Sequence, residues 1–189
     1  MKHLKKILST AAKALLFAAV VLTGSCGEEL AQNKWSRMRA YYLCQNVATI
    51  PTLYHACTGP EQWCTVRRSA NMKQLLFDSL RENDQVNLTA DMGYTRFHIE
   101  RGLIIGLPSL AEPGAGTPVV TCYDIVCPNC YDNGTSKNVE IQENGKALCR
   151  LCNRTYDLNN QGIIVGGERG KTLERYRVTY NGTSLLVDN

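Results

Sequence analysis

Two Cys-x-x-Cys pairs constrain the fold of this 189-residue chain more than any other feature. The first pair is Cys127 and Cys130. The second, Cys149 and Cys152, follows after 18 residues that contain an Asn-Gly turn signal at 144–145. A β-hairpin centred on that turn is expected to bring the two sulfur-bearing loops face to face. Because four thiolates in that arrangement close a tetrahedron around one ion, the sequence predicts a four-cysteine metal site.

The spacing of the two pairs resembles that of zinc ribbons and rubredoxin-like knuckles, which implies a metal-binding subdomain over about 122–160. Pro128 suits such a knuckle, because its ring fixes the turn after the first cysteine. Two disulfides are the alternative, in which Cys127 would pair with Cys149 or Cys152, because exported proteins can oxidise their cysteines.

The N-terminus carries the signature of an export signal. Four lysines among the first 13 residues precede the nine-residue apolar run ALLFAAVVL, which is too short for a transmembrane helix. The run leads into LTGSC, which resembles the lipobox of bacterial lipoproteins. That resemblance implies that residues 1–25 are a signal peptide, that Cys26 is lipidated, and that a membrane is the partner of the anchor. The expected location is the cell envelope, as an outer-membrane lipoprotein on its periplasmic or outer face. An ordinary secretory cleavage site is the alternative.

Charge and length place limits on the mature chain. Removal of four lysines with the signal leaves 17 of the 21 basic residues, against 17 acidic residues, so the formal charge is near zero. No basic stripe indicates a nucleic-acid partner. Residues 26–40 are polar and predict a lipid-anchored tether, and residues 41–189 are long enough for one domain with a hydrophobic core.

From Tyr41 onward, short apolar runs alternate with turn signals, and this pattern predicts an all-β antiparallel sandwich or barrel. Residues 72–80 have an apolar spacing that fits either a helix or a strand, and the all-β context favours the strand. Predicted strands cover 62–68, 85–90, 95–100, 103–107, 119–126, 138–143, 146–149, 162–167, 173–180 and 184–188.

The segment after Cys152 resembles the tail of Rieske domains. In that family an aromatic-Asp pair, a glycine turn and a Leu-x-x-Tyr-x-Val strand follow the second cluster loop. The matching residues stand here in the same order: Tyr156, Asp157, Leu158, Gly162, Leu173, Tyr176, Val178 and Gly182. Upstream, GLIIGLPSL and VVTCYDIVCPNC resemble the strands that lead into the first loop. The resemblance covers 42–189 and implies a Rieske-like sandwich or barrel.

The ligands depart from the Rieske pattern, in which two histidines and two cysteines hold a two-iron cluster. Asn129 and Cys152 stand where that family has its histidines. The histidines of the mature chain, His55 and His98, lie far from both loops in the sequence. We interpret them as ordinary surface or strand histidines rather than ligands.

The predicted export route indicates which metal the site would bind. Iron–sulfur clusters are usually inserted before translocation, and folded cargo leaves with a twin-arginine signal, which MKHLKK lacks. A chain that crosses unfolded would acquire its metal outside, which favours redox-inert Zn²⁺. An iron ion or a 2Fe-2S cluster held by cysteines alone is the alternative, because ligand softness does not separate the metals.

The four remaining cysteines of the domain admit two interpretations. Cys57 and Cys64, within CTGPEQWC, are candidates for a disulfide that closes a small loop. Alternatively, these two residues, Cys44 and Cys122 are small buried apolar side chains.

Two functions follow from these features. One is a non-catalytic envelope lipoprotein whose Rieske-like domain holds a structural metal. The other is an electron-transfer protein that serves an extracytoplasmic oxidoreductase, with a redox partner that the sequence does not identify. Enzyme activity is disfavoured, because the chain contains no G-x-S-x-G, no H-E-x-x-H and no phosphate-binding glycine loop, so no catalytic residue is assigned.

Overall fold

A computed structural model of the chain describes residues 35–36, 39–88 and 101–189. The predicted signal peptide, Cys26, residues 26–34 of the predicted tether, and the predicted strand 95–100 with His98 lie outside the described residues. Within the described part, no helix has the length and apolar character that a membrane span requires.

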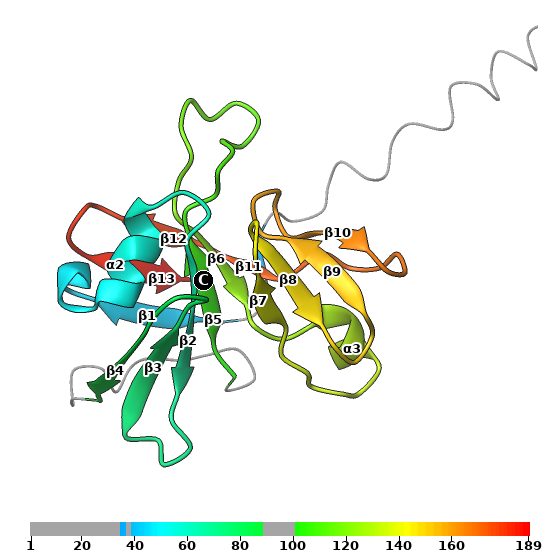
Figure 1. The fold of residues 1–189 in the computed structure, drawn as a ribbon, viewed down its shortest axis with the longest axis horizontal. Coiled ribbons are helices and arrows are strands. Elements are labelled where there is room, and N and C mark those ends of the chain that lie inside the picture. The colour runs from blue at the N-terminus through cyan, green and yellow to red at the C-terminus, as the bar shows by residue number, and fades with distance from the viewer. Residues whose placement is uncertain (1–34, 37–38, 89–100) are drawn as a thin grey trace, which may run out of the picture. The chain divides into compact units, whose positions relative to one another are not determined.

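The described chain is built mainly from antiparallel strands, which confirms the all-β prediction (Figure 1). A six-stranded sheet has the order β11 (Arg175–Tyr176), β6 (Thr121–Asp124), β5 (Leu103–Gly106), β2 (Trp63–Arg68), β3 (Gln74–Asp78) and β4 (Asn83–Asn87). A three-stranded sheet has the order β1 (Tyr41–Cys44), β13 (Leu185–Asp188) and β12 (Val178–Tyr180). A four-stranded sheet has the order β10 (Ile163–Gly166), β9 (Arg154–Asp157), β8 (Lys146–Cys149) and β7 (Glu140–Gln142).

Three short helical segments complete the described fold: η1 (Val47–Thr49), α2 (Pro51–Thr58) and α3 (Pro128–Asp132). The sequence did not predict α2. Pro51 stands at its first turn, where the missing N–H costs nothing, and Gly59 follows its last residue. Leu53, Ala56 and Cys57 form its buried face at the spacing of a helix.

The strand predictions differ from the structure in informative places. Residues 74–78 form β3, as the all-β context favoured, with alternating burial. The predicted strand 173–180 is wrong as one element, because it is split between two sheets. Tyr176 pairs with Cys122 in the six-stranded sheet, whereas Val178 pairs with Val187 in the three-stranded one. Strands β1 and β9 were not predicted.

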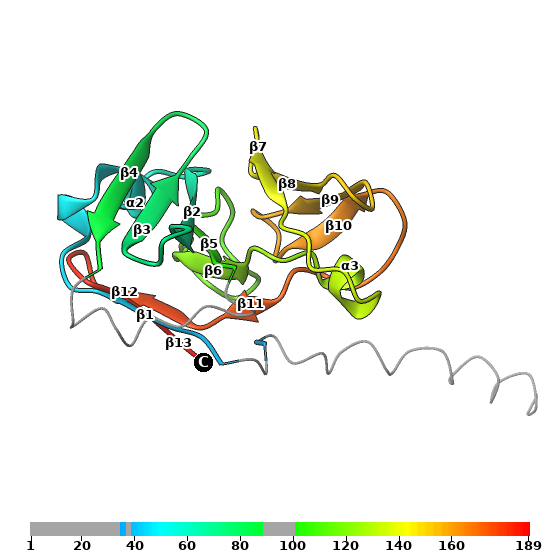
Figure 2. The same cartoon turned by 90° about the horizontal axis from the view of Figure 1, so that it is seen from below.

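Strand β5, labelled from a second direction in Figure 2, contributes side chains to two hydrophobic cores. Leu103 and Ile105 belong to the first core, with α2 and the three-stranded sheet, and Ile104 belongs to the second core, with the four-stranded sheet. Successive side chains of a strand point to opposite faces, so a strand buried on both faces reads as a continuous apolar run. That explains why all four residues of β5 are buried.

The packed domain begins before the predicted boundary at Tyr41. The backbone N–H of Ser36 donates to the carbonyl of Arg175 over 2.6 Å, and the Arg175 guanidinium lies 4.7 Å from the centre of the Trp35 ring. Ala40 is buried in the first core. The last residues assigned to the tether, as far as they are described, therefore belong to the folded unit.

Asp124 is a fully buried carboxylate at the end of β6. It accepts hydrogen bonds from the Tyr176 hydroxyl and the Val126 backbone N–H, each over 2.7 Å. Burial raises the pKa of Asp124 to about 7, against the lowering effect of these two hydrogen bonds. An unfolded Asp titrates near pH 3.9, so from about pH 4 to 7 the folded state holds a proton that the unfolded state has lost.

This difference predicts that Asp124 makes the protein less stable as pH rises through that interval. Asp124→Asn should remove this dependence. The difference in unfolding free energy between variant and parent should therefore shift in favour of the variant by up to about 4 kcal/mol between pH 4 and 8. Urea titrations at several pH values measure it. Parallel stability curves for the two proteins would contradict the assignment.

Candidate metal centre

The first cysteine pair is set by the short helix α3. Cys127 immediately precedes the helix, Pro128 occupies its first position, and the backbone N–H of Tyr131 donates to the Cys127 carbonyl over 3.0 Å. Residues three apart lie on the same side of a helical turn, so Cys130 faces the same way as Cys127. Both side chains are buried.

The second pair lies in the turn between β8 and β9. Cys149 ends β8, and Cys152 is followed by Asn153, whose φ of +54° lets the chain reverse into β9. Asparagine adopts this left-handed conformation more readily than most residues. Upstream, the predicted hairpin is present as β7 and β8, joined by Asn144 and Gly145, whose φ angles of 58° and 62° fit a type I′ turn.

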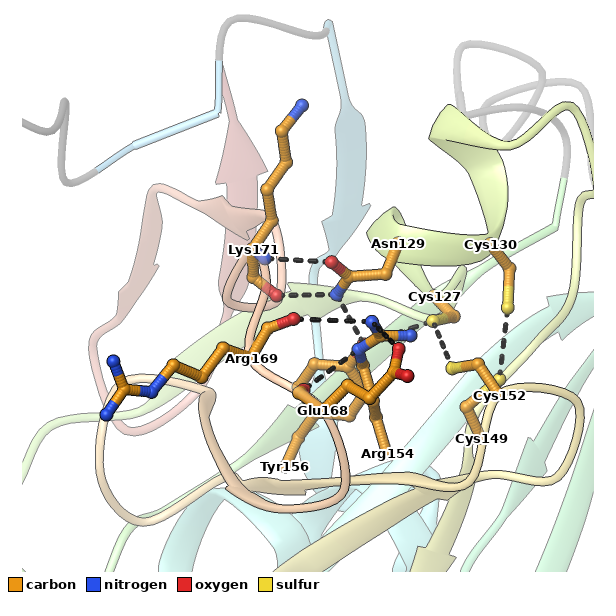
Figure 3. A network of polar contacts seen from close by, with 10 residues as sticks. All are labelled: Cys127, Asn129, Cys130, Cys149, Cys152, Arg154, Tyr156, Glu168, Arg169 and Lys171. Atoms are coloured by element: carbon orange, nitrogen blue, oxygen red, sulfur yellow. Dashed lines mark hydrogen bonds and ion pairs between the residues drawn. The ribbon is translucent and has the colours of Figure 1, made fainter.

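The structure brings the four predicted ligands together (Figure 3). All four Sγ atoms lie within 4.8 Å of one another. Two contacts cross between the loops: Cys127 Sγ lies 3.6 Å from Cys152 Sγ, and Cys130 Sγ lies 3.5 Å from Cys149 Sγ. A disulfide would need about 2.05 Å, so the cysteines are free thiols and the disulfide alternative is not observed. Four Zn–S bonds of about 2.3 Å at tetrahedral angles place sulfurs roughly 3.8 Å apart. The donor set fits one tetrahedral ion.

Comparison with protein-family models, curated proteins and solved structures finds no match to this chain. Its function is therefore inferred from its own residues. Within the described ranges, these four cysteines are the one group of three or more His, Cys, Asp or Glu side chains close enough to share an ion.

The thiols differ in their surroundings. Burial raises the pKa of Cys127 and of Cys130. Burial acts in the same direction on Cys152, but hydrogen bonds from the side chain and backbone of Arg154, together with those from Cys149 and Cys130, lower the pKa of Cys152 to about 6. Cys152 is also the one ligand that is only half-buried. Metal binding therefore has to displace protons from the more deeply buried thiols, which couples occupancy to pH.

Arg154 ties a distant loop to the centre. Its Nε donates to the carbonyl of Glu168 over 3.0 Å, and its Nη2 reaches the Glu168 carboxylate at 3.1 Å and the Arg169 carbonyl at 3.3 Å. Four thiolates around a divalent ion carry a net charge of about −2, so the adjacent guanidinium offsets part of it.

Asn129 and Tyr156 form a second support. The Asn129 amide donates to the Tyr156 oxygen over 2.9 Å and to the Lys171 carbonyl over 2.8 Å, and its oxygen accepts from the Lys171 N–H over 2.8 Å. Because the Tyr156 oxygen accepts from Asn129, its own proton is available to Cys127 Sγ, 3.0 Å away. The Asn129 side chain thereby fixes the loop at Lys171.

No sequence pattern indicates this role of Asn129, because an Asn in a polar loop can have many roles. The loop after β10 contains Gly170, which lies so close to the Asn129 amide that a Cβ atom would overlap it. The loop is thus fitted closely to the back of the cysteine site.

The remaining predicted residues lie apart from the centre. His55 is a surface residue, as expected, with its Nδ1 2.6 Å from the Glu82 carboxylate. The candidate disulfide between Cys57 and Cys64 is not formed, because both are free thiols packed in the first core. Burial raises the pKa of Cys57 to about 12, as expected of a thiol that packs as a small apolar group.

Removal of the Tyr156 hydroxyl should loosen the metal without displacing a ligand. Tyr156→Phe is expected to weaken metal affinity about 10- to 100-fold, as partners of metal ligands typically do, and to speed release to a chelator. Tyr123→Phe is the matched control, because Tyr123 is buried in the same core and its hydroxyl donates to the Leu158 carbonyl over 3.0 Å. Both variants should lose about 1–3 kcal/mol of stability. Equal release rates for the two would show that the Tyr156 hydroxyl does not support Cys127.

Proposed function

We propose that this chain is an envelope-anchored lipoprotein whose domain, Rieske-like in its sequence pattern, holds one Zn²⁺ through Cys127, Cys130, Cys149 and Cys152. The ion has a structural, non-catalytic role. The observation that carries the proposal is the meeting of four thiols, from two loops, within 4.8 Å. Zinc supplies a redox-inert tetrahedral crosslink when bound.

A single ion fits the cluster better than two irons. In a 2Fe-2S cluster each iron takes two cysteines, so sulfurs on different irons stand apart by the extra length of the cluster. Here two separations of 3.5–3.6 Å join one loop to the other, and no pair of sulfurs exceeds 4.8 Å.

A structural role agrees with the composition of the second core. Cys127, Cys130 and Cys149 are themselves members of that core, and Cys152 packs against it. An ion joining them would link α3 to the β8–β9 turn, so its binding energy would also be folding energy for the four-stranded sheet.

Electron transfer by a single cysteine-bound iron is the second candidate. It is favoured by the partial exposure of Cys152 and by the Tyr156 hydroxyl beside Cys127, because solvent access and hydrogen bonds to sulfur tune the potential of iron–thiolate centres. In that case the protein would serve an extracytoplasmic oxidoreductase.

Metal analysis of protein isolated from its native envelope distinguishes the two candidates. We expect about one zinc per chain, Zn–S distances near 2.3 Å by X-ray absorption, and no visible colour. One iron per chain with strong visible absorbance would replace the first candidate with the second. The absence of any bound metal would refute both.

Cys149→Ser should abolish stoichiometric metal binding and lower the melting temperature by more than about 10 °C, because the site contributes to folding. Cys57→Ala is the control, since it also removes a buried thiol but lies in the first core. It should keep its full metal content and lose only about 1–2 kcal/mol of stability. Normal metal binding by Cys149→Ser would overturn the four-cysteine site.

The lipid anchor is tested separately at Cys26. Cys26→Ala should release the protein from membranes into the soluble fraction, because acyl chains on this cysteine provide the proposed attachment. Cys57→Ala again serves as the control and should remain membrane-bound. Continued membrane retention of the Cys26→Ala variant would refute lipidation.

A further inference from the structure

The loop after β10 contacts both cysteine loops, the first at 127–130 and the second at 149–152. Residues 167–171 of this loop, here called the clasp, are all exposed. They connect the end of β10 at Gly166 to Leu173, which is buried in the second core. An exposed segment gains little from hydrophobic burial, so its polar and close-packed contacts determine where it lies. Those contacts run from each half of the clasp to a different cysteine loop (Figure 3).

The second half of the clasp is attached to the first cysteine loop. Asn129 lies between the two predicted ligands of that loop, and its amide pairs with both the N–H and the carbonyl of Lys171, each over 2.8 Å. Because both bonds are to the backbone, they fix the path of the chain itself. The ion pair between the Lys171 and Asp132 side chains, at 2.8 Å, adds little, because both side chains are exposed.

The first half of the clasp is attached to the residues that directly follow the second cysteine pair. Arg154 donates to the carbonyls of Glu168 and Arg169, over 3.0 and 3.3 Å. Gly167 has a φ of +87° and lies so close to the Asn153 carbonyl that a Cβ atom would stand 2.7 Å from its oxygen. Both the conformation and the space at this position therefore favour glycine.

The clasp and the metal would connect the same two loops. The ion would do so through the four sulfurs, and the clasp does so through Asn129 on one side and Arg154 on the other. Two connections in parallel support each other, because either one holds the loops at the spacing that the other needs and so lowers its entropic cost. By linkage, the factor by which the metal stabilises the closed clasp equals the factor by which the closed clasp tightens metal binding.

We propose that the clasp controls the exchange of the ion. While the clasp holds both cysteine loops, the ligands are kept from separating, so the ion leaves after the clasp has detached from one loop. Loss of the ion in turn loosens the clasp, so the conformation of residues 167–171 reports metal occupancy at the protein surface. The inference rests on the four-cysteine metal site proposed above, and it holds whether the ion is zinc or iron.

The Lys171 amide gives a direct measurement of clasp opening. Its N–H donates to Asn129 Oδ1 over 2.8 Å, so its hydrogen exchange is slow only while the clasp is closed. Exchange is followed by NMR on the full chain, first loaded with Zn²⁺ and then stripped by a chelator in the presence of a reductant. Removal of the metal should speed exchange at Lys171 at least about tenfold. The amide of Phe77, a buried residue of β3 in the first core, is the internal control and should be unaffected.

Gly170→Ala should open the clasp while the metal is still bound. A Cβ atom at this position would overlap the Asn129 amide, so that amide could not keep its paired contact with the Lys171 backbone. The four cysteines are unchanged, and the variant should still bind one metal per chain. It should release zinc to a chelator about tenfold faster than the parent and exchange the Lys171 amide faster in the metal-loaded state.

Gly116→Ala is the matched control. Gly116 is also an exposed loop glycine without a positive φ, and a Cβ atom there would meet nothing within 4 Å. This variant should match the parent in zinc release and in exchange at Lys171. Circular dichroism and metal content, measured on each variant, separate opening of the clasp from loss of the fold. Should Gly170→Ala fail to fold, the exchange measurement on the unsubstituted chain decides alone.

Two results would overturn the control of exchange by the clasp. One is equal exchange at Lys171 in the metal-loaded and metal-free chain. The other is zinc release at the parent rate from a folded, metal-bound Gly170→Ala variant. Both are obtained on protein that binds its metal, so they differ from failure of the metal site itself, in which the unsubstituted chain would bind no metal.

Discussion

Four sulfur atoms crowd within 4.8 Å of one another, and the packing of the second core and its four-stranded sheet depends on this constraint. As thiolates they would repel one another, and as thiols they would leave buried weak donors with poor partners. A divalent cation at their centre would remove both problems at once. It would also convert two loops, 22 positions apart from Cys127 to Cys149, into a single crosslinked unit. The β7–β8 hairpin positions the two cysteine loops, and the ion would crosslink them.

The cysteine site is supported from behind by the loop at 168–171, which contributes no predicted metal ligand. Arg154 and Asn129 both reach the loop at 168–171, the first through carbonyls and a carboxylate, the second through a paired contact with the Lys171 backbone. Tyr156 connects Asn129 to Cys127. Two interactions would stabilise thiolates at this site. The Arg154 guanidinium offsets part of their negative charge, and the Tyr156 phenol supplies a hydrogen bond to sulfur.

The sequence predicted those parts of the site whose chemistry is local. Cysteine spacing and the Asn-Gly turn determine the loops and the hairpin over a few residues, so both could be recognised without knowledge of the rest. The role of Asn129 depends on a partner 42 positions away, and nothing near it in the sequence indicates that partner. The split of 173–180 into two strands was hidden for the same reason, because each half follows the pairing of a different neighbour. Helix α2 was missed because its eight residues are too few for a clear helical period.

Strand β5 limits which sequence changes the domain can accept during evolution. Its neighbouring isoleucines, Ile104 and Ile105, serve opposite cores. A one-residue insertion or deletion would exchange the two sides and disturb both cores together, whereas a conservative replacement would touch only one. The two cores are therefore expected to tolerate point substitutions independently, but both depend on the same register of β5. Length variation during evolution should accumulate in the loops and spare this strand.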